Sequence, residues 1–252
     1  MKKYLLKYTL EFLVIFLGIS LSFFINNWNE SNKNEELEIK YLKSLKEEYE
    51  SNLMLFDQSF SHHIPRWNSL DVFFNFSNKN SFEEMDSVVN IFTINWSFNP
   101  NLGATNSLIS SGYIELLKND EIKKLVSRMP FLIDDYTEEE KRTELVCVEM
   151  GYYLTEHYVY NPRNEKEKKQ CVNLILSTPF RNKIYDLQLW LESIILEGPV
   201  LRKNFVRLIE LIESYDKVSY EDFKDIKYDN SFPSKFNYNF MDISIIETLE
   251  LE

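Results

Sequence analysis

The sequence predicts an all-α protein in which a single amino-terminal transmembrane helix is followed by an antiparallel helical bundle. Its 252 residues include only 5 Gly and 7 Pro, so turn-forming residues are few, and long helices are favoured over a many-stranded β fold. Hydrophobic residues make up 44% of the chain and charged residues 27%, a composition typical of a chain with a sizeable core. We expect three parts: an anchor at residues 1–30, a bundle at 31–217, and a tail at 218–252 that packs on the bundle.

The first 30 residues predict a retained membrane anchor. The uncharged run 12–25 is about 21 Å long as a helix, which is too short to span a bilayer alone. Tyr8 and Trp28 are separated by about 30 Å of helix, so they can serve as interfacial aromatics, with Glu11 one turn inside the edge. No small-x-small cleavage site follows the run, so a cleaved signal peptide is less favoured, as is an amphipathic buried helix.

The charges on either side of the anchor predict its orientation. Three lysines precede the apolar run: Lys2, Lys3 and Lys7. The segment 30–36 that follows the run contains three glutamates and one lysine. By the positive-inside rule, the amino terminus lies in the cytoplasm and the other ~220 residues lie in the periplasm, outside the bacterial inner membrane.

Gly18 and Ser22 form a small-xxx-small pair, a pattern that lets two membrane helices approach closely. Such pairs also arise by chance in apolar helices, and Ser20 lies off the Gly18 face, so chance is the favoured interpretation. The expected partner is therefore the lipid bilayer, with a protein partner or a second copy of the chain as further candidates.

An amphipathic helix of roughly 25 residues is predicted after the anchor. Apolar residues recur along it at spacings of three and four: Leu37, Tyr41, Leu45, Tyr49, Leu53, Phe56 and Phe60. Residues 29–34 contain neither Pro nor Gly, so the anchor helix can continue into this one as a single rod. The spacing is nearer four than a strict heptad, which favours burial inside the bundle over a coiled coil. Pro65 is expected to end this helix or to begin the next.

The middle of the chain is predicted to contain short helices. Ser81 and Glu84 fit a capping box that begins a helix reaching Phe92. The segment 97–112 is the least helical in pattern, with a turn near its start and a stop at its end. We expect one short helix between that turn and that stop.

Two long helical stretches follow. The first covers residues 120–160, with a break or kink at Pro130. The second covers residues 180–215, with Thr178 as the expected N-cap and a kink at Pro199. A last short helix or a frayed end is expected within the tail.

Three segments are shared with a known family: residues 11–30, residues 41–48 with 52–53, and residues 98–101 with 108–112 and 116–120. The most specific motif is Asn-Asn-Trp-Asn-Glu at 26–30, directly after the membrane helix. With these segments the chain resembles an uncharacterised family of bacterial single-pass membrane proteins of unknown function. The resemblance implies a retained anchor and a helical domain, and it supplies no activity. The chain lacks the family's longer basic leader, so its predicted orientation depends on three lysines.

Residue types that bind metals or perform catalysis are scarce. The three histidines are His62, His63 and His157, and the adjacent pair points to different sides of a helix, so no metal site is expected. A phosphate-binding glycine loop, a nucleophile elbow and a dinucleotide fingerprint are all missing from the sequence, so we expect no cofactor and favour a non-enzyme. The net charge of −12 argues against nucleic acid as a partner, because that affinity comes mainly from cationic contacts to phosphate.

The two cysteines allow two predictions. Cys147 and Cys171 could form a disulfide between two helical arms if the domain is periplasmic. Two reduced core cysteines are the favoured alternative, because free cysteine is commonly buried.

An acidic cluster could bind a divalent cation or a basic partner: Asp134, Asp135, Glu138, Glu139, Glu140 and Glu144. Lys141 and Arg142 interrupt it, which favours a solvated helix face.

The segment 99–112 is the best candidate for a recognition site. Its candidate residues are Asn99, Asn101, Asn106, Ser110, Ser111 and Gly112. A buried polar loop must have its amides paired, and these side chains can provide the pairing. Capping and turn formation are therefore favoured over recognition of a ligand or partner.

Together these patterns predict a non-catalytic, membrane-tethered helical interaction module of the bacterial envelope. One alternative is a small-molecule sensor or enzyme, with a pocket in the bundle lined by Trp96, Asn101 and Asn106. Another is a membrane effector of a defence or toxicity system, which would need a multimeric pore.

Overall fold

The structure of the protein, a computed structural model, describes the backbone of residues 2–215 and the side chains of residues 10–215. This part of the chain contains six α-helices, one 3-10 helix and no strand, which confirms the all-α prediction. The elements in chain order are α1 (Lys2–Phe74), α2 (Phe82–Thr93), α3 (Gly103–Ser110), η1 (Tyr113–Leu116), α4 (Asp120–His157), α5 (Glu165–Ile175) and α6 (Thr178–Glu213). The tail predicted at 218–252 lies outside the described residues.

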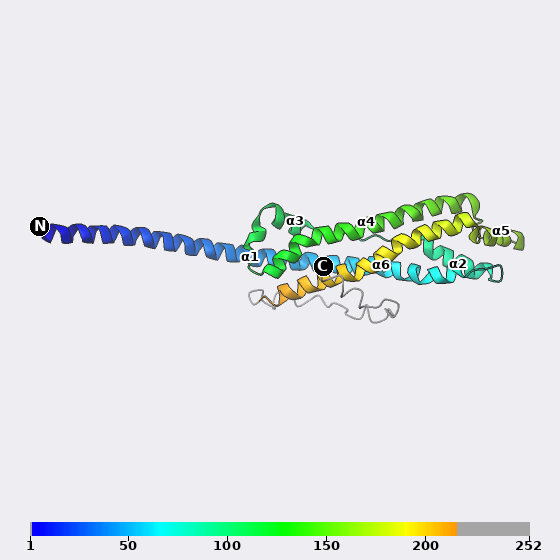
Figure 1. The fold of residues 1–252 in the computed structure, drawn as a ribbon, viewed down its shortest axis with the longest axis horizontal. Coiled ribbons are helices and arrows are strands. Elements are labelled where there is room, and N and C mark those ends of the chain that lie inside the picture. Colours follow the sequence, from blue (N-terminus) through cyan, green and yellow to red (C-terminus); the bar gives the residue numbers. More distant parts are fainter. Residues whose placement is uncertain (1, 216–252) are drawn as a thin grey trace.

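Helix α1 is the axis of the molecule (Figure 1). Its first part projects alone, and the long helices α4 and α6 run beside its second part. Helix α6 is antiparallel to both α1 and α4, and it packs against both. Helices α1 and α4 share a direction because residues 75–119 bring the chain back from the far end of the bundle to the entry end, where α1 joins it.

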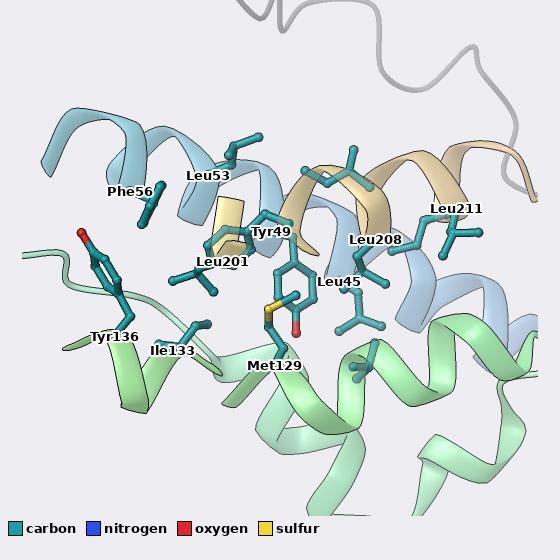
Figure 2. Packing of buried hydrophobic residues seen from close by; sticks show 14 of the residues in the cluster. Leu45, Tyr49, Leu53, Phe56, Met129, Ile133, Tyr136, Leu201, Leu208 and Leu211 are labelled. Atoms are coloured by element: carbon teal, nitrogen blue, oxygen red, sulfur yellow. The ribbon is translucent and has the colours of Figure 1, made fainter. Parts of the chain in front are cut away.

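Two apolar clusters fill the bundle, one after the other along its axis. Figure 2 shows part of the cluster near the entry end, with side chains from α1, α4 and α6: Leu45, Tyr49, Leu53, Phe56, Met129, Ile133, Tyr136, Leu201, Leu208 and Leu211. The cluster near the far end also includes side chains from α2 and α5, such as Phe92 and Cys171. From Leu45 to Phe60 the apolar stripe of α1 is therefore buried within the chain, as predicted, whereas Leu37 and Tyr41 at its start are half-buried.

Prolines do not interrupt the long helices. The prediction that Pro65 ends a helix is wrong, because α1 continues through it to Phe74. Pro65 is exposed, whereas His63 and Arg66 on either side of it are buried. Tertiary packing of these neighbours offsets the lost backbone hydrogen bond. Pro130 likewise lies inside α4.

The helix starts follow simple capping chemistry. The capping box predicted for α2 is present, with Ser81 Oγ accepting from the Glu84 N–H and Glu84 Oε2 accepting from the Ser81 N–H. The N-cap of α6 is Ser177, one residue before the predicted Thr178. Ser177 Oγ accepts from the Phe180 N–H, so the same cap chemistry operates one position earlier.

The projecting part of α1 has the properties of a membrane span. Among the described helices, it is the one that is long and apolar enough to cross a bilayer. The most apolar stretch of this part contains no buried residue. Glu11 and Trp28 are exposed, and Ser22 Oγ donates to the Gly18 carbonyl at 2.8 Å; the Tyr8 side chain lies outside the described ones. The apolar segment and the first bundle helix are thus one continuous element.

Candidate functional site

The segment predicted for recognition, residues 99–112, is held against α1 by a reciprocal pair of hydrogen bonds. Asn52 Nδ2 donates to the Asn101 carbonyl at 2.7 Å, and the Asn101 N–H donates to Asn52 Oδ1 at 2.8 Å. Asn101 Oδ1 in turn accepts from the Gly103 N–H at 3.1 Å. Both polar groups of the Asn52 amide, which is buried, are therefore used in fixing the start of α3.

Glu48 of α1 caps helix α3 from outside it. The N-cap residue of α3 is Leu102, whose side chain offers no oxygen to the free N–H groups of the first turn. Glu48 Oε2 accepts from the Ala104 N–H at 2.6 Å, and Oε1 accepts from the Thr105 N–H at 3.0 Å and from Thr105 Oγ1 at 2.5 Å. A carboxylate at a helix N-terminus is also favoured by the helix dipole.

The other predicted residues of this segment make local contacts or face solvent. The hydroxyls of Ser110 and Ser111 donate to a carbonyl of the preceding turn. Gly112 adopts a left-handed conformation with φ of 75°, which suits the residue that ends a helix. The side chains of Asn99 and Asn106 are exposed. These contacts are those of capping and turn formation, and recognition by this segment stays a prediction.

A buried polar layer separates the two apolar clusters of the bundle. Its members are Ser59, His63 and Arg66 of α1, Asn95 of the segment after α2, and Glu140, Thr143 and Cys147 of α4. Sequence reasoning did not anticipate this polar layer. It brings together acidic, basic, imidazole and thiol groups, and we therefore treat it as the candidate site.

Glu140 is the centre of the polar layer, with only 1% of its surface exposed. Its Oε1 accepts from Ser59 Oγ at 2.8 Å, from His63 Nε2 at 3.0 Å and from the Tyr136 hydroxyl at 3.2 Å. Its Oε2 accepts from the Phe98 N–H at 2.6 Å. A buried carboxylate must be paired and hydrogen-bonded, and four donors meet that requirement here.

His63 is a neutral bridge between a cation and an anion. Arg66 Nη1 lies 3.3 Å from His63 Nδ1, and since arginine only donates, Nδ1 must accept. The ring proton is therefore on Nε2, where it is donated to Glu140. Burial lowers the pKa of His63, and the hydrogen bond to Glu140 opposes this only in part. The imidazole thus stays uncharged at neutral pH.

Arg66 is buried, with 2% of its surface exposed, and its guanidinium binds two further groups. Nη1 donates to Asn95 Oδ1 at 3.0 Å, and Nη2 donates to Cys147 Sγ at 2.8 Å. Burial lowers the pKa of Arg66 but leaves it protonated, because an arginine side chain holds its proton throughout the physiological range. With Glu140 as the anion, the polar layer is neutral in sum.

Both cysteines are free and buried. Burial raises the pKa of the Cys147 thiol, and Arg66 acts in the opposite direction. Cys171 Sγ donates to the Val159 carbonyl at 3.5 Å. The two sulfurs have different partners in this structure, and a disulfide between Cys147 and Cys171 stays a prediction.

The prediction of a solvated acidic face on α4 needs one correction. Asp134, Asp135, Glu138 and Glu144 are exposed and Glu139 is half-buried, but Glu140 points into the bundle. The reason is the helical period: the inward positions of α4 are spaced by three and four, at Met129, Ile133, Tyr136, Glu140, Thr143, Cys147 and Met150. If the apolar stripe of α4 is extended at the same spacing through polar positions, it predicts that Glu140 is buried.

The residues proposed to line a pocket have separate surroundings. The Trp96 ring stacks on His62 with 4.1 Å between ring centroids, and Trp96 is itself exposed. Asn101 is bonded to Asn52, and the Asn106 side chain is exposed. Within the described residues, no group of three or more His, Cys, Asp or Glu side chains could hold a metal ion.

Comparison with known protein families identifies the family of the chain. Residues 11–178 match the family of unknown function DUF6090. The chain belongs to this family. The part matched to DUF6090 begins within the exposed apolar part of α1, includes the whole polar layer and ends where α6 begins. Neither the curated proteins nor the solved structures contain a match to the chain.

Proposed function

We propose that this DUF6090 protein is a non-catalytic, membrane-tethered interaction module of the bacterial envelope. In this proposal α1 crosses the inner membrane with its amino terminus in the cytoplasm. The bundle then stands in the periplasm and binds a protein partner or a second copy of the chain.

One observation carries the proposal: a single helix is both the exposed apolar span and the axis of the folded core. Side chains at 10–25 of α1 are exposed, including Phe16 and Phe23, whereas Leu45 and Phe56 of the same helix are fully buried. Exposed apolar surface of that length is stable only in a lipid or protein environment. The rigid join means that the bundle is held at a fixed place relative to the bilayer.

The polar layer supports a non-catalytic role. The oxygens of Glu140 are occupied by donors of the chain itself, and both nitrogens of His63 are used. Glu48 and Asn52 are likewise committed to the start of α3. Catalytic groups need a reacting atom within hydrogen-bond reach, whereas these groups reach one another.

The length of α1 sets how far a partner can lie from the bilayer. From Trp28 to Phe74 the helix extends about 69 Å, at 1.5 Å per residue. The entry end of the bundle is next to the membrane, and the far end, with α2 and α5, is displaced along the rod (Figure 1). The proposed module therefore presents its side surfaces over a range of heights above the lipid.

Topology is tested with a reporter that is active only in the periplasm, fused after Glu252. We expect activity from the full chain and none after deletion of residues 1–28. Replacing Lys2, Lys3 and Lys7 with Glu is the orientation control and should reduce the signal, because these lysines set the charge asymmetry. Activity of a cytoplasm-only reporter at the same place would contradict the orientation.

The interaction role is tested by photo-crosslinking in intact cells with a pair of matched positions on α4. Tyr152 is 71% exposed and Leu154 is 1% exposed, so a photoreactive residue samples neighbours at 152 and the core at 154. An adduct of defined mass at 152, absent at 154, is the expected result. If scanning the exposed positions of α4, α5 and α6 yields no adduct, the interaction role is wrong.

A further inference from the structure

The outward side of α4 carries a stripe of exposed apolar side chains. Leu145, Val148 and Tyr152 are between 47% and 71% exposed. Their spacings of three and four residues place them on one face of the helix, away from the buried positions Glu140 and Cys147. Single exposed apolar residues are common on protein surfaces, whereas an aligned group marks a surface that contacts another molecule.

Helix α6 carries a second stripe of the same kind. Tyr185, Leu189 and Leu196 are between 44% and 56% exposed. Their spacings of four and seven residues again place them on one face of the helix, and Leu187 and Leu191 on its other side are buried. Both long helices therefore have a buried side and an outer side that is partly apolar.

The two stripes lie on the side of the bundle that faces away from α1. The buried side of α4 bonds to α1, where Ser59 Oγ donates to Glu140. The buried side of α6 packs on α1, where Gly198 lies so close to Phe60 that a Cβ would have no room. Each stripe is on the other side of its own helix, so both face away from α1.

Contacts between α4 and α6 bring the two stripes to the same level along the bundle. Lys183 Nζ lies 3.7 Å from Glu149 Oε2, and the Arg142 guanidinium lies 5.3 Å from the centroid of the Trp190 ring. The middle of each stripe falls between these two contacts in sequence, so the stripes run side by side. Together they form what we call the α4–α6 face: Leu145, Val148, Tyr152, Tyr185, Leu189 and Leu196.

The charge around the α4–α6 face is predominantly negative. Six exposed acids occur within residues 138–156 and 182–196: Glu138, Glu144, Glu149, Glu156, Asp186 and Glu192. The same two ranges contain three cations, Lys141, Arg142 and Lys183, and the last two are each paired with one of these acids. A surface that complements the α4–α6 face is therefore apolar at its centre and positively charged at its edges.

This charge argues against the occupants that the chain itself could supply. A second copy would bring the same acids, because identical patches meet each other in a two-fold dimer. Residues 216–252 contain nine acidic and four basic residues, so the carboxyl-terminal part of the chain is negatively charged as well. An anionic lipid surface would be repelled for the same reason. The complementary occupant is thus a segment of a different protein.

An α-helix suits the α4–α6 face better than an extended peptide does. Two antiparallel helices with apolar stripes can pack a third helix through its side chains at i, i+3, i+4 and i+7. A partner that adds a β-strand needs the edge of a sheet, and the part of the chain that the structure describes contains no strand.

We propose that the α4–α6 face binds an amphipathic, positively charged α-helix of a partner protein. Large apolar side chains of that helix contact the two stripes, and its lysines and arginines contact the surrounding acids. This inference rests on the interaction role proposed above, to which it adds the chemistry of the partner and the surface that binds it.

The test uses the full chain in phosphatidylcholine nanodiscs and a fluorescent designed peptide of about 20 residues, with leucines on one helical face and lysines on the other. Empty nanodiscs give the background from peptide bound to lipid. We expect saturable binding that weakens by about tenfold or more when salt rises from about 0.05 M to about 0.5 M. A peptide with glutamate in place of every lysine should not bind. A scrambled Leu/Lys peptide should bind about tenfold more weakly or less.

The apolar part of the face is tested by a double variant, Leu145→Ser with Tyr152→Ser. It should weaken binding of the Leu/Lys peptide by about tenfold or more, because the apolar area at the centre of the contact is lost. The matched control is Met54→Ser with Val72→Ser, which removes two apolar side chains of α1 that are 60% and 50% exposed. This control should bind as the wild type does, and circular dichroism checks that both proteins are folded.

The acidic part of the face is tested by Glu144→Lys with Glu192→Lys, one exposed position on each helix. This double variant should also weaken binding of the Leu/Lys peptide by about tenfold or more, and it should reduce the salt dependence, because fewer charge pairs form.

Two results would overturn the inference. One is a lack of saturable binding above the level of empty nanodiscs. The other is an equal loss of affinity in the α1 control and in the variants of the α4–α6 face. Crosslinking in cells separates either result from failure of the interaction role. Adducts at other exposed positions of the bundle, with none at 148 or 189, would mean that the module binds its partner through another surface, whereas the interaction role itself fails if no position yields an adduct.

Discussion

Glu139 and Glu140 are neighbours on α4, yet their carboxylates differ in the hydrogen-bond donors that surround them. Glu140 receives hydrogen bonds from α1, from α4 itself and from the segment after α2. Glu139 keeps a buried oxygen, Oε2, that has no hydrogen-bond partner in the described part of the chain. A carboxylate supplied with donors can hold several elements together, whereas one without donors contributes no such link. Successive residues of a helix are turned by about 100° from one another, so two adjacent carboxylates have different surroundings.

The strongest test of this contrast is removal of the Glu140 carboxylate. Glu140→Ala leaves His63, Ser59 and the Phe98 N–H without an acceptor, and it leaves Arg66 as a buried cation without its anion. We expect the free energy of unfolding to fall by about 3–5 kcal/mol. Urea denaturation followed by circular dichroism measures this change. Glu138→Ala, at an exposed site, should stay within about 0.5 kcal/mol of the wild type; similar losses for both variants would contradict the assigned roles.

The next test concerns the close approach of Gly198 in α6 to Phe60 in α1. Gly198→Ala places a methyl group against the Phe60 ring and should lower the free energy of unfolding by about 1–3 kcal/mol, despite the better helix propensity of alanine. Combining it with Phe60→Leu should restore part of the loss, because the smaller side chain leaves room. Thermal melts of the single and double variants measure these changes in stability. A Gly198→Ala variant as stable as the wild type would mean that α6 is not packed this closely against α1.

A third carboxylate, Glu48, extends the comparison to a helix cap. Glu48→Gln keeps the shape but replaces one acceptor oxygen by a donor, so it can no longer accept from both Ala104 and Thr105. We expect a loss of about 1–2 kcal/mol, measured by urea denaturation, together with faster hydrogen exchange in α3. Glu47→Gln, on the exposed side of α1, is the matched control. Unchanged exchange in α3 would show that the cap is dispensable.

The smallest expected effect is in the pH dependence of stability. Burial lowers the pKa of His63 below its unfolded value, so the unfolded chain binds a proton that the folded chain does not. The stabilisation is present above about pH 6.5 and is lost as pH falls below it, by about 1 kcal/mol per pH unit. His63→Gln should flatten this acid-side slope, whereas His62→Gln should keep it. Equal slopes of stability against pH in the two variants would show that a group other than His63 causes the acid sensitivity.

Much of this architecture could be predicted from the sequence, because it depends on local rules. The apolar stripe of α1 and the lack of Pro or Gly at 29–34 predicted a continuous rod, and Ser81 with Glu84 predicted the start of α2. Pro65 was misleading, since its local penalty is outweighed by packing of residues far away in sequence. The polar layer was missed for a similar reason: three of the four donors of Glu140 lie 42 to 81 residues away in sequence, and no spacing within α4 reveals those three.

In the proposed membrane-spanning arrangement, the uninterrupted α1 helix also determines how the bundle is oriented around the membrane normal. Each residue of an α-helix advances the chain by about 100° of rotation, so the number of residues between Trp28 and Glu38 fixes which side of the bundle faces a neighbour in the plane of the membrane. One inserted residue would turn the whole bundle by roughly a quarter of a circle, whereas seven would return it to within about 20° of its starting azimuth and lift it by about 10 Å. Height and azimuth are thereby coupled through one short, exposed length of helix.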